Sequence, residues 1–155
     1  MDTKSASVRA VMTVKDLIQS RAEVFSVSED FTVHDAARYL RDKQVRSVGV
    51  LNCQGKLVGV VSQSDISDKV AAENKCPAWM RVSEVMSINL VAVPPGTHLD
   101  ECVRLMEKHA IYHLLVVDEE ENFRGMISAQ DLLRVVASDE KARADMLESF
   151  IFLQR

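Results

Sequence analysis

The stretch GVVSQSDI, residues 59–66, returns later in the chain as GMISAQDL, residues 125–132. The two aspartates, Asp65 and Asp131, lie 66 positions apart (131 − 65 = 66). Each stretch begins with β-branched or other apolar residues and ends in a polar segment that is typical of a helix start. The sequence therefore predicts a buried strand that runs directly into a helix, once in each half of the chain.

The repetition extends well beyond these two stretches. Residues 31–66 align with residues 97–132 without a gap, at a constant offset of 66. Matched positions keep their chemical class, as Val33 does with Leu99 and Leu40 with Met106. Upstream, TVKDLI (13–18) resembles RVSEVM (81–86), although the connection that follows is two residues shorter in the second copy. A unit of about 55 residues cannot cover an apolar sheet face alone, so we expect the two copies to pack together.

Each copy has the pattern strand, helix, strand, strand, helix, which predicts an α+β fold. AEVFSV (22–27) and NLVAV (89–93) are the first strands, and VRSVGVL (45–51) and KLVGVVS (56–62) are paired strands around a turn. The helix between them has apolar residues at the spacing of a buried face. These residues are Val33, Ala36, Ala37 and Leu40 in the first copy, and Leu99, Cys102, Val103, Met106 and Ala110 in the second.

Two segments lie outside the repeat. KCPAWMR (75–81) is typical of a linker, in which we expect Trp79 to pack on the surface as an anchor. Residues 138–155 predict a C-terminal helix with one apolar side, made of Ala142, Met146, Leu147, Phe150 and Ile151. That side can dock back onto the protein or onto a second chain, and we favour an oligomer contact.

Composition and charge exclude several classes of function. The net charge is −4, with 19 Lys and Arg scattered among 23 acidic residues, so we expect no nucleic-acid partner. Three cysteines without a C-x-x-C pair indicate reduced thiols, and no apolar run approaches the ~20 residues of a membrane span. We therefore expect a soluble, cytoplasmic protein that has no membrane partner.

Catalytic and metal motifs are weak in this sequence. His109 and His113 have the spacing of two helical metal ligands, but the alignment places His109 near a helix end and His113 on the next strand. We expect no metal site there. The sequence offers no nucleophile–base pair and no glycine-rich phosphate loop, so we expect no catalytic residues, no catalytic cofactor and no enzyme.

The repeated Ser-x-x-Asp has two interpretations. As a capping box, the serine hydroxyl and the acidic side chain satisfy backbone N–H groups at a helix start. We interpret Thr32-x-x-Asp35 and Thr97-x-x-Asp100 as caps of this kind. Alternatively, the glycine three residues before the serine lets a ligand or a neighbouring backbone approach. A helix N-terminus then favours phosphate, and the aspartate suits the vicinal hydroxyls of a ribose.

The duplicated order of elements, closed by GVVSQSDI and GMISAQDL, resembles the CBS domain family (cystathionine β-synthase-type domains), as a stand-alone tandem pair or Bateman module. VSEVM (82–86) also matches the usual lead-in of such a domain. The resemblance implies two tandem β-α-β-β-α repeats, packed sheet to sheet as one pseudo-twofold module. We expect the first repeat and its N-terminal lead-in at 1–74, a linker at 75–81, the second repeat at 82–137 and a C-terminal helix at 138–155.

In that family two clefts bind adenosyl ligands such as AMP, ADP, ATP, NAD(H) or S-adenosylmethionine. The resemblance implies four nucleotide-binding residues in each site, taken from both repeats. They are Ser62, Asp65, Tyr112 and His113 in one site, and Ser128, Asp131, Arg46 and Ser47 in the other.

The sequence departs from the family in the middle strand of each copy. The family often has Arg-His-apolar-Pro-Val there, whereas this chain has RSVGVLN (46–52) and YHLLVVD (112–118), with Gly49 and Leu115 in place of the proline. Only the first copy keeps the arginine, Arg46. Because arginine binds phosphate through two parallel hydrogen bonds, we expect the site that contains Asp131 and Arg46 to be the better one.

The resemblance implies a regulatory sensor that binds an adenine nucleotide and signals by a population shift. We expect a homodimer to which the C-terminal helix contributes, and a target protein that the sequence does not identify. The alternative is a protein-interaction module whose clefts are vestigial. The presence of serine and aspartate in both copies favours ligand binding.

Overall fold

The computed structural model describes residues 12–21, 23–135 and 140–151, without the side chains of residues 140–143. The outer parts of the predicted lead-in and C-terminal helix, at 1–11, 138–139 and 152–155, lie outside the described residues, as does the side chain of Ala142. No helix in the described part of the chain is both long enough and apolar enough to cross a bilayer.

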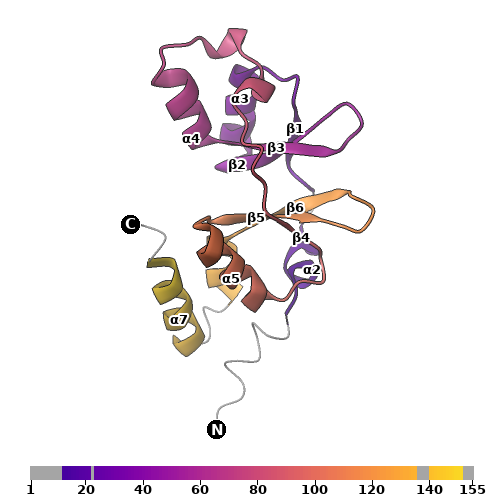
Figure 1. Cartoon of the computed structure of the whole chain (residues 1–155), viewed down its shortest axis with the longest axis vertical. Helices are drawn as coiled ribbons and strands as arrows, with labels where there is room; N and C mark the ends of the chain where they lie inside the picture. Colours follow the sequence, from indigo (N-terminus) through magenta and orange to yellow (C-terminus); the bar gives the residue numbers. More distant parts are fainter. Residues whose placement is uncertain (1–11, 22, 136–139, 152–155) are drawn as a thin grey trace. The chain divides into compact units, whose positions relative to one another are not determined.

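Each repeat contains one three-stranded mixed sheet (Figure 1). The first consists of β1 (Ser26–Ser28), β2 (Ser47–Leu51) and β3 (Leu57–Ser62), and the second of β4 (Ala92–Val93), β5 (His113–Val117) and β6 (Phe123–Ser128). The middle strand pairs in parallel with the short first strand in both sheets, and β2 pairs antiparallel with β3. The predicted α+β class and the order of strands are confirmed.

The helices complete the repeated pattern. They are α2 (Val14–Ile18), α3 (Val33–Lys43), α4 (Gln63–Ile66) with its π-helical continuation η1 (Ser67–Ala71), the short 3₁₀ turns η2 (Pro77–Trp79) and η3 (Val82–Glu84), α5 (Leu99–His109), α6 (Ala129–Val135) and α7 (Glu140–Ile151). The helices α3 and α5 follow the first strands of their repeats, and α4 and α6 follow the last.

The chain forms two compact units, and each unit combines segments from both repeats. Unit 1 combines the described parts of 1–22, 92–119 and 124–155, and unit 2 combines 23–91 and 120–123. Unit 1 thus joins the first lead-in (residues 12–21) to the second sheet, and unit 2 joins the second lead-in (residues 81–87) to the first. The repeat boundaries predicted from the sequence stay a prediction, because repeats and compact units divide the chain differently.

Backbone hydrogen bonds hold each lead-in in its unit. In unit 1, the Val14 N–H donates to the Thr97 carbonyl at 2.9 Å. In unit 2, Ser87 and Val60 exchange two backbone hydrogen bonds, at 2.8 and 3.0 Å. Each lead-in therefore packs against the sheet of the repeat that it does not precede in sequence.

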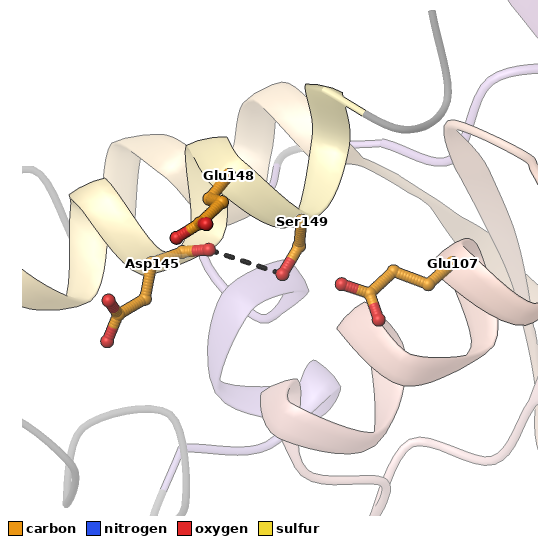
Figure 2. A pocket seen from close by; sticks show the side chains of 4 residues that line it. All are labelled: Glu107, Asp145, Glu148 and Ser149. Atoms are coloured by element: carbon orange, nitrogen blue, oxygen red, sulfur yellow. Dashed lines mark hydrogen bonds between the residues drawn. The ribbon is translucent and has the colours of Figure 1, made fainter. Parts of the chain in front are cut away.

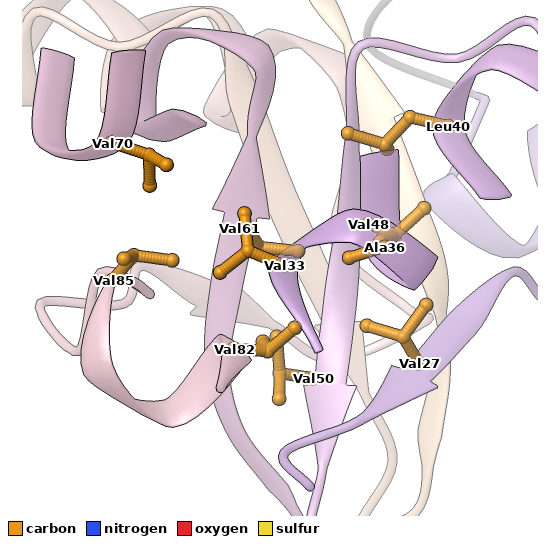
Figure 3. Close-up of a cluster of buried hydrophobic side chains, with 10 residues drawn as sticks. All are labelled: Val27, Val33, Ala36, Leu40, Val48, Val50, Val61, Val70, Val82 and Val85. Atoms are coloured by element: carbon orange, nitrogen blue, oxygen red, sulfur yellow. The ribbon is translucent and has the colours of Figure 1, made fainter. Parts of the chain in front are cut away.

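The core of unit 2 consists mainly of valine, a residue that suits the pleated surface of a strand. Its buried members are Val27, Val33, Ala36, Leu40, Val48, Val50, Val61, Val70, Val82 and Val85. Figure 3 shows Val82 and Val85 of the second lead-in pointing into the same cluster as the strand residues. The lead-in is therefore part of the core of unit 2.

Three expectations about single residues are wrong. Ala110 lies outside the buried face of α5, because it ends the helix in the left-handed conformation with φ 52° and is exposed. Thr97 does not cap α5. The N-cap residue is His98, whose side chain makes no cap hydrogen bond among the described residues. The offset of 66 aligns His98 with Thr32, which does cap α3. Trp79 is 86% exposed, because Met80 and Val82 pack against the core instead.

The C-terminal helix α7 packs back onto α5 and α6 of unit 1. Met146 and Phe150 are buried there, whereas Leu147 is 42% and Ile151 55% exposed. The apolar side predicted from the sequence is therefore divided between a packed half and an exposed half. The oligomer contact stays a prediction, which the exposed half can serve.

We predict that Gly59→Ala destabilises the protein by about 1–3 kcal/mol, since overpacking forces neighbours to move. A β-carbon at position 59 would lie 2.6 Å from Met86 Sδ and 3.0 Å from the Ser87 carbonyl oxygen. Gly96→Ala is the matched control, because no described atom lies within 4 Å of its β-carbon position. Urea unfolding measures both variants, and equal losses would contradict the role given to Gly59.

We predict that Met146→Ala lowers the free energy of unfolding by about 2–5 kcal/mol, as expected for a large side chain removed from a core. Leu147→Ala, one position along the same helix, should cost about 0.5 kcal/mol or less at a single protein concentration. Urea unfolding at two concentrations separates the roles of these residues. A loss at Leu147 that is larger at the higher protein concentration and shrinks on dilution would indicate an oligomer contact. A smaller loss at Met146 than at Leu147 would contradict the packing of α7.

Candidate functional site

The two Ser-x-x-Asp motifs lie where the last strand of each sheet passes into a helix. The Ser62 N–H donates to Asp65 Oδ2 at 3.0 Å, and the Asp65 N–H donates to Ser62 Oγ at 3.2 Å. In the second copy the corresponding distances between Ser128 and Asp131 are 2.8 and 3.1 Å. The capping interpretation is confirmed for both motifs, and each aspartate side chain is consequently held in a fixed orientation.

Several backbone amides at the helix starts have acceptors within the protein. The Gln63 N–H donates to the Arg46 carbonyl at 2.9 Å, and the Ala129 N–H donates to the Tyr112 carbonyl at 2.8 Å. The third amide, that of the aspartate, is bound by the serine hydroxyl. Phosphate binding at these helix starts stays a prediction, and the basic side chains near each motif are further candidates for that role.

The structure brings the predicted site residues together within each repeat. Ser47 pairs with Ser62 across β2 and β3, directly after Arg46. Tyr112, which is 38% exposed, and His113 stand at the start of β5 beside the Ser128 motif. The cross-repeat pairs expected from the family, namely Asp65 with Tyr112 and His113 and Asp131 with Arg46 and Ser47, stay a prediction.

Asp65 is buried, with 9% of its surface exposed, and both of its carboxylate oxygens are engaged. Oδ2 accepts hydrogen bonds from the backbone and hydroxyl of Ser62. Oδ1 lies 3.0 Å from Lys69 Nζ and 3.4 Å from Ser87 Oγ. Lys69 also donates to the Val85 carbonyl at 2.7 Å, which ties the second lead-in to this motif.

Asp131 is more exposed, since 21% of its side chain is accessible. Oδ2 accepts from Arg21 Nη2 at 3.0 Å, and Oδ1 lies 3.8 Å from Arg134 Nη1. Arg21 also donates to the Met126 carbonyl, so it binds β6 and the aspartate together. A carboxylate therefore lies next to a guanidinium at this motif, and next to an ammonium at Asp65.

Sequence reasoning missed Arg21, Lys69 and Ser87. Lys69 has a local signal, because it lies four residues after Asp65 on a helical segment, where opposite charges meet. The other two residues follow the repeated lead-in segments TVKDLI (13–18) and RVSEVM (81–86), and this repetition is the signal that could have found them. The lead-in exchange then carries each of them to an aspartate of the other repeat.

The two histidines at metal-ligand spacing lie on different elements. His109 ends α5 and His113 begins β5, as the alignment predicts. No cluster of three or more His, Cys, Asp or Glu suited to a metal ion occurs among the described residues. Burial, with a smaller effect from Glu101, raises the pKa of the Cys102 thiol to about 12. That thiol is protonated at neutral pH and is a poor nucleophile.

Two hollows of unit 1 lie against α7. One, of about 460 Å³, is lined by Glu107, Asp145, Glu148 and Ser149, and Figure 2 shows the Ser149 hydroxyl bound to the Asp145 carbonyl within the same helix. Its three carboxylates disfavour an anionic ligand. The other, also about 460 Å³, is lined largely by apolar residues of α6 and α7 together with Tyr112.

Comparisons of the sequence and of the structure with known proteins identify the same family. The CBS domain model matches residues 8–72 and 82–138. The CBS domain-containing protein YhcV of Bacillus subtilis (strain 168) is 32% identical over 130 residues, which cover 84% of this chain and 89% of YhcV. Inosine-5'-monophosphate dehydrogenase of Nitrosopumilus maritimus is 32% identical over 108 residues, which cover 70% of this chain. The matched part of that enzyme is only 21% of its length, about a fifth.

Solved structures support the same fold. A proposed signal-transduction protein with CBS domains from Burkholderia ambifaria MC40-6 is similar with a TM-score of 0.75 and 27% identity, over 83% of this chain and 96% of that one. The CBS domain pair of protein MJ0100, in complex with 5′-methylthioadenosine and S-adenosyl-L-methionine, has a TM-score of 0.72 at 24% identity, over 82% and 97%. The resemblance drawn from the sequence is confirmed.

We predict that Asp65→Asn lowers the free energy of unfolding by about 1–3 kcal/mol, because a lysine partner and three hydrogen-bond donors lose a buried, charged acceptor. Asp131→Asn should cost about 1 kcal/mol or less, since the Asp131 carboxylate is more exposed to solvent than that of Asp65. Urea unfolding at neutral pH compares the two variants. An equal or larger loss at Asp131 would show that burial does not decide the strength of these motifs.

Proposed function

Because the chain belongs to the CBS domain family, we propose that it is a regulatory module rather than an enzyme. Its ligand is an adenine nucleotide, namely AMP, ADP, ATP or NAD(H), bound at a Ser-x-x-Asp motif. The MJ0100 pair supports this proposal only through the fold, which in that protein holds two adenosyl compounds. The reaction of the dehydrogenase is not carried over, because the chain corresponds to a fifth of that enzyme.

One observation carries the proposal: each motif holds an oriented carboxylate beside a basic side chain. The vicinal hydroxyls of a ribose can donate to a carboxylate, and a phosphate can accept from a guanidinium or an ammonium. The pairs Asp131–Arg21 and Asp65–Lys69, each at 3.0 Å, provide both groups within one small area. A nucleotide carries the matching set of hydroxyl and phosphate groups on one molecule.

Asp131 is the better candidate for the working site. At Asp65, four contacts and burial occupy both oxygens, so a ribose would have to displace protein groups. At Asp131, Oδ1 has Arg134 at 3.8 Å as its described partner, beyond hydrogen-bond distance. We therefore propose one strong site at Asp131 and a weaker or empty one at Asp65. Arg46 and Ser47 are the further residues that we propose for the strong site.

The signalling step is a population shift. Arg21 is the last described residue before Glu23, with which unit 2 begins, so a ligand that changes the position of Arg21 acts on the connection between the units. Such a ligand signals only if it binds one arrangement more tightly than the other. We also propose a cytoplasmic location, a homodimer that uses the exposed half of α7, and a target protein that reads the arrangement.

The alternative function is a protein-interaction module without a ligand. The ion pairs that already engage both aspartates favour it, because a satisfied capping box needs no ligand to explain its residues. The two functions differ in whether nucleotides stabilise the fold. Thermal unfolding distinguishes them directly.

We predict that at least one of AMP, ADP, ATP and NAD(H) raises the unfolding midpoint of the wild type, and that Asp131→Asn removes this shift. A ligand at 100 times its dissociation constant adds about 2.7 kcal/mol to the folded state. For a chain of this size the shift is roughly 2–4 °C per kcal/mol. S-adenosylmethionine is included in the same panel.

Asp42→Asn is the control, because it also removes a carboxylate from an ion pair, but from an exposed pair with Arg41 in unit 2. It should keep the full shift. Loss of the shift in Asp65→Asn alone would move the working site to the other repeat. Unmoved curves for every ligand would reject the sensor function and leave the interaction module.

A further inference from the structure

We propose that Arg21 determines the class of ligand at the Asp131 motif, and that it selects adenosyl ligands with an anionic group near the ribose over uncharged or cationic ones. This inference rests on the proposed function and deepens it. It concerns one side chain that the sequence analysis did not assign to a site. All the contacts that carry it lie within unit 1.

Arg21 is held at two points and remains accessible. Its Nη1 donates to the Met126 carbonyl on β6, and its Nη2 lies 3.0 Å from Asp131 Oδ2. The side chain keeps 36% of its surface exposed. Gly125 lies beside the guanidinium with φ 136°, a backbone conformation that favours glycine, and a β-carbon there would be in ordinary contact with Nη1 at 3.9 Å. The guanidinium is therefore placed on the motif, with part of its donor set still facing solvent.

The charges at this motif decide which ligands fit. Asp131 Oδ2 already accepts from Ser128 at 2.8 Å and from Arg21 at 3.0 Å. When ribose hydroxyls donate to the same carboxylate, its attraction for the guanidinium weakens, and the bound ligand removes water from Arg21. A cation in that position needs a new counter-ion, which a phosphate supplies through parallel hydrogen bonds. Adenosine supplies none, and the sulfonium of S-adenosylmethionine adds a second positive charge.

The first repeat provides a comparison within the same molecule. At the first motif the second lead-in contributes Ser87, whose hydroxyl lies 3.4 Å from Asp65 Oδ1. The cation there is Lys69, which comes from the helix after the motif and not from the lead-in. The offset of 66 aligns Lys69 with Val135, so the second motif takes its close cation from the lead-in alone. The two motifs should therefore differ in the ligands that they accept.

Arg134 also faces Asp131 and provides the matched control. Its Nη1 is 3.8 Å from Oδ1, and its side chain is 72% exposed, so its charge is screened by solvent. Removing it changes the net charge of the region as much as removing Arg21 does. A general electrostatic effect would appear in both variants, whereas selection by a fixed guanidinium would appear only at Arg21.

Isothermal titration calorimetry with AMP, adenosine and S-adenosylmethionine tests the proposal on the full chain. The variants are Arg21→Ser, which introduces the residue type that the second lead-in places near Asp65, Arg21→Lys and Arg134→Ser, and Asp131→Asn identifies the site. We expect Arg21→Ser to weaken AMP binding about tenfold, as for the loss of one charge-assisted contact. Adenosine affinity should change less than about twofold, since no charged contact is lost. Arg21→Lys should keep most of the preference for AMP, and Arg134→Ser should keep all of it.

The ratio of AMP to adenosine affinity is the readout, because a variant that is merely less stable would lower both affinities. An unchanged ratio in Arg21→Ser would overturn the inference and leave Arg21 as a structural tie to β6. Equal tightening of all ligands would also overturn it, since Arg21 would then act as a latch without selectivity. If no ligand binds the wild type, the proposed function fails and this inference with it, an outcome distinct from the other two.

Discussion

The pairing of each lead-in with the sheet of the other repeat is the constraint on which the described structure depends. Ser87 and Val60 exchange backbone hydrogen bonds in unit 2, and Val14 bonds to Thr97 in unit 1. This exchange completes the core around Val82 and Val85. It also carries a side chain from each lead-in to the aspartate of the motif. The glycine three residues before the serine has a structural explanation in unit 2, because the backbone of the lead-in takes the space at Gly59.

The same atoms serve stability and the proposed binding. A capping box orients the aspartate, and a fixed carboxylate is a better acceptor for a ribose than a freely rotating one, because less entropy is lost on binding. A ligand must however compete with protein groups for the carboxylate oxygens, since every hydrogen bond of the capping box and of its ion pair must be kept or replaced when the ligand binds. Asp65 and Asp131 have the same box but differ in burial, and we propose that this difference separates a largely structural motif from one that accepts a ligand.

Much of the fold could be predicted from the sequence, because the chain is repeated at an offset of 66 and the apolar spacing of each strand and helix can be compared between the two copies. The errors have physical causes. The spacing to Asp100 predicts Thr97 as a cap, although the offset points to His98, and Ala110 follows a helix face that ends one residue earlier. The linker predicts Trp79 as a packed anchor, but the neighbouring Met80 and Val82 pack against the core instead. At the site, Arg21 and Asp131 are 110 residues apart, so only a three-dimensional structure could pair them.

The position of Arg21 links selectivity to signalling. A ligand that binds both arrangements of the protein equally produces no signal, however tightly it binds. When Arg21 exchanges its contact with the Asp131 carboxylate for a contact with a ligand phosphate, the affinity for that ligand depends on the position of the first lead-in. The arrangement that keeps Arg21 beside the phosphate is then favoured by the energy of that contact, and a ligand without an anionic group provides no such bias. Selection of an anionic ligand and transmission of its presence are, in this proposal, consequences of one contact.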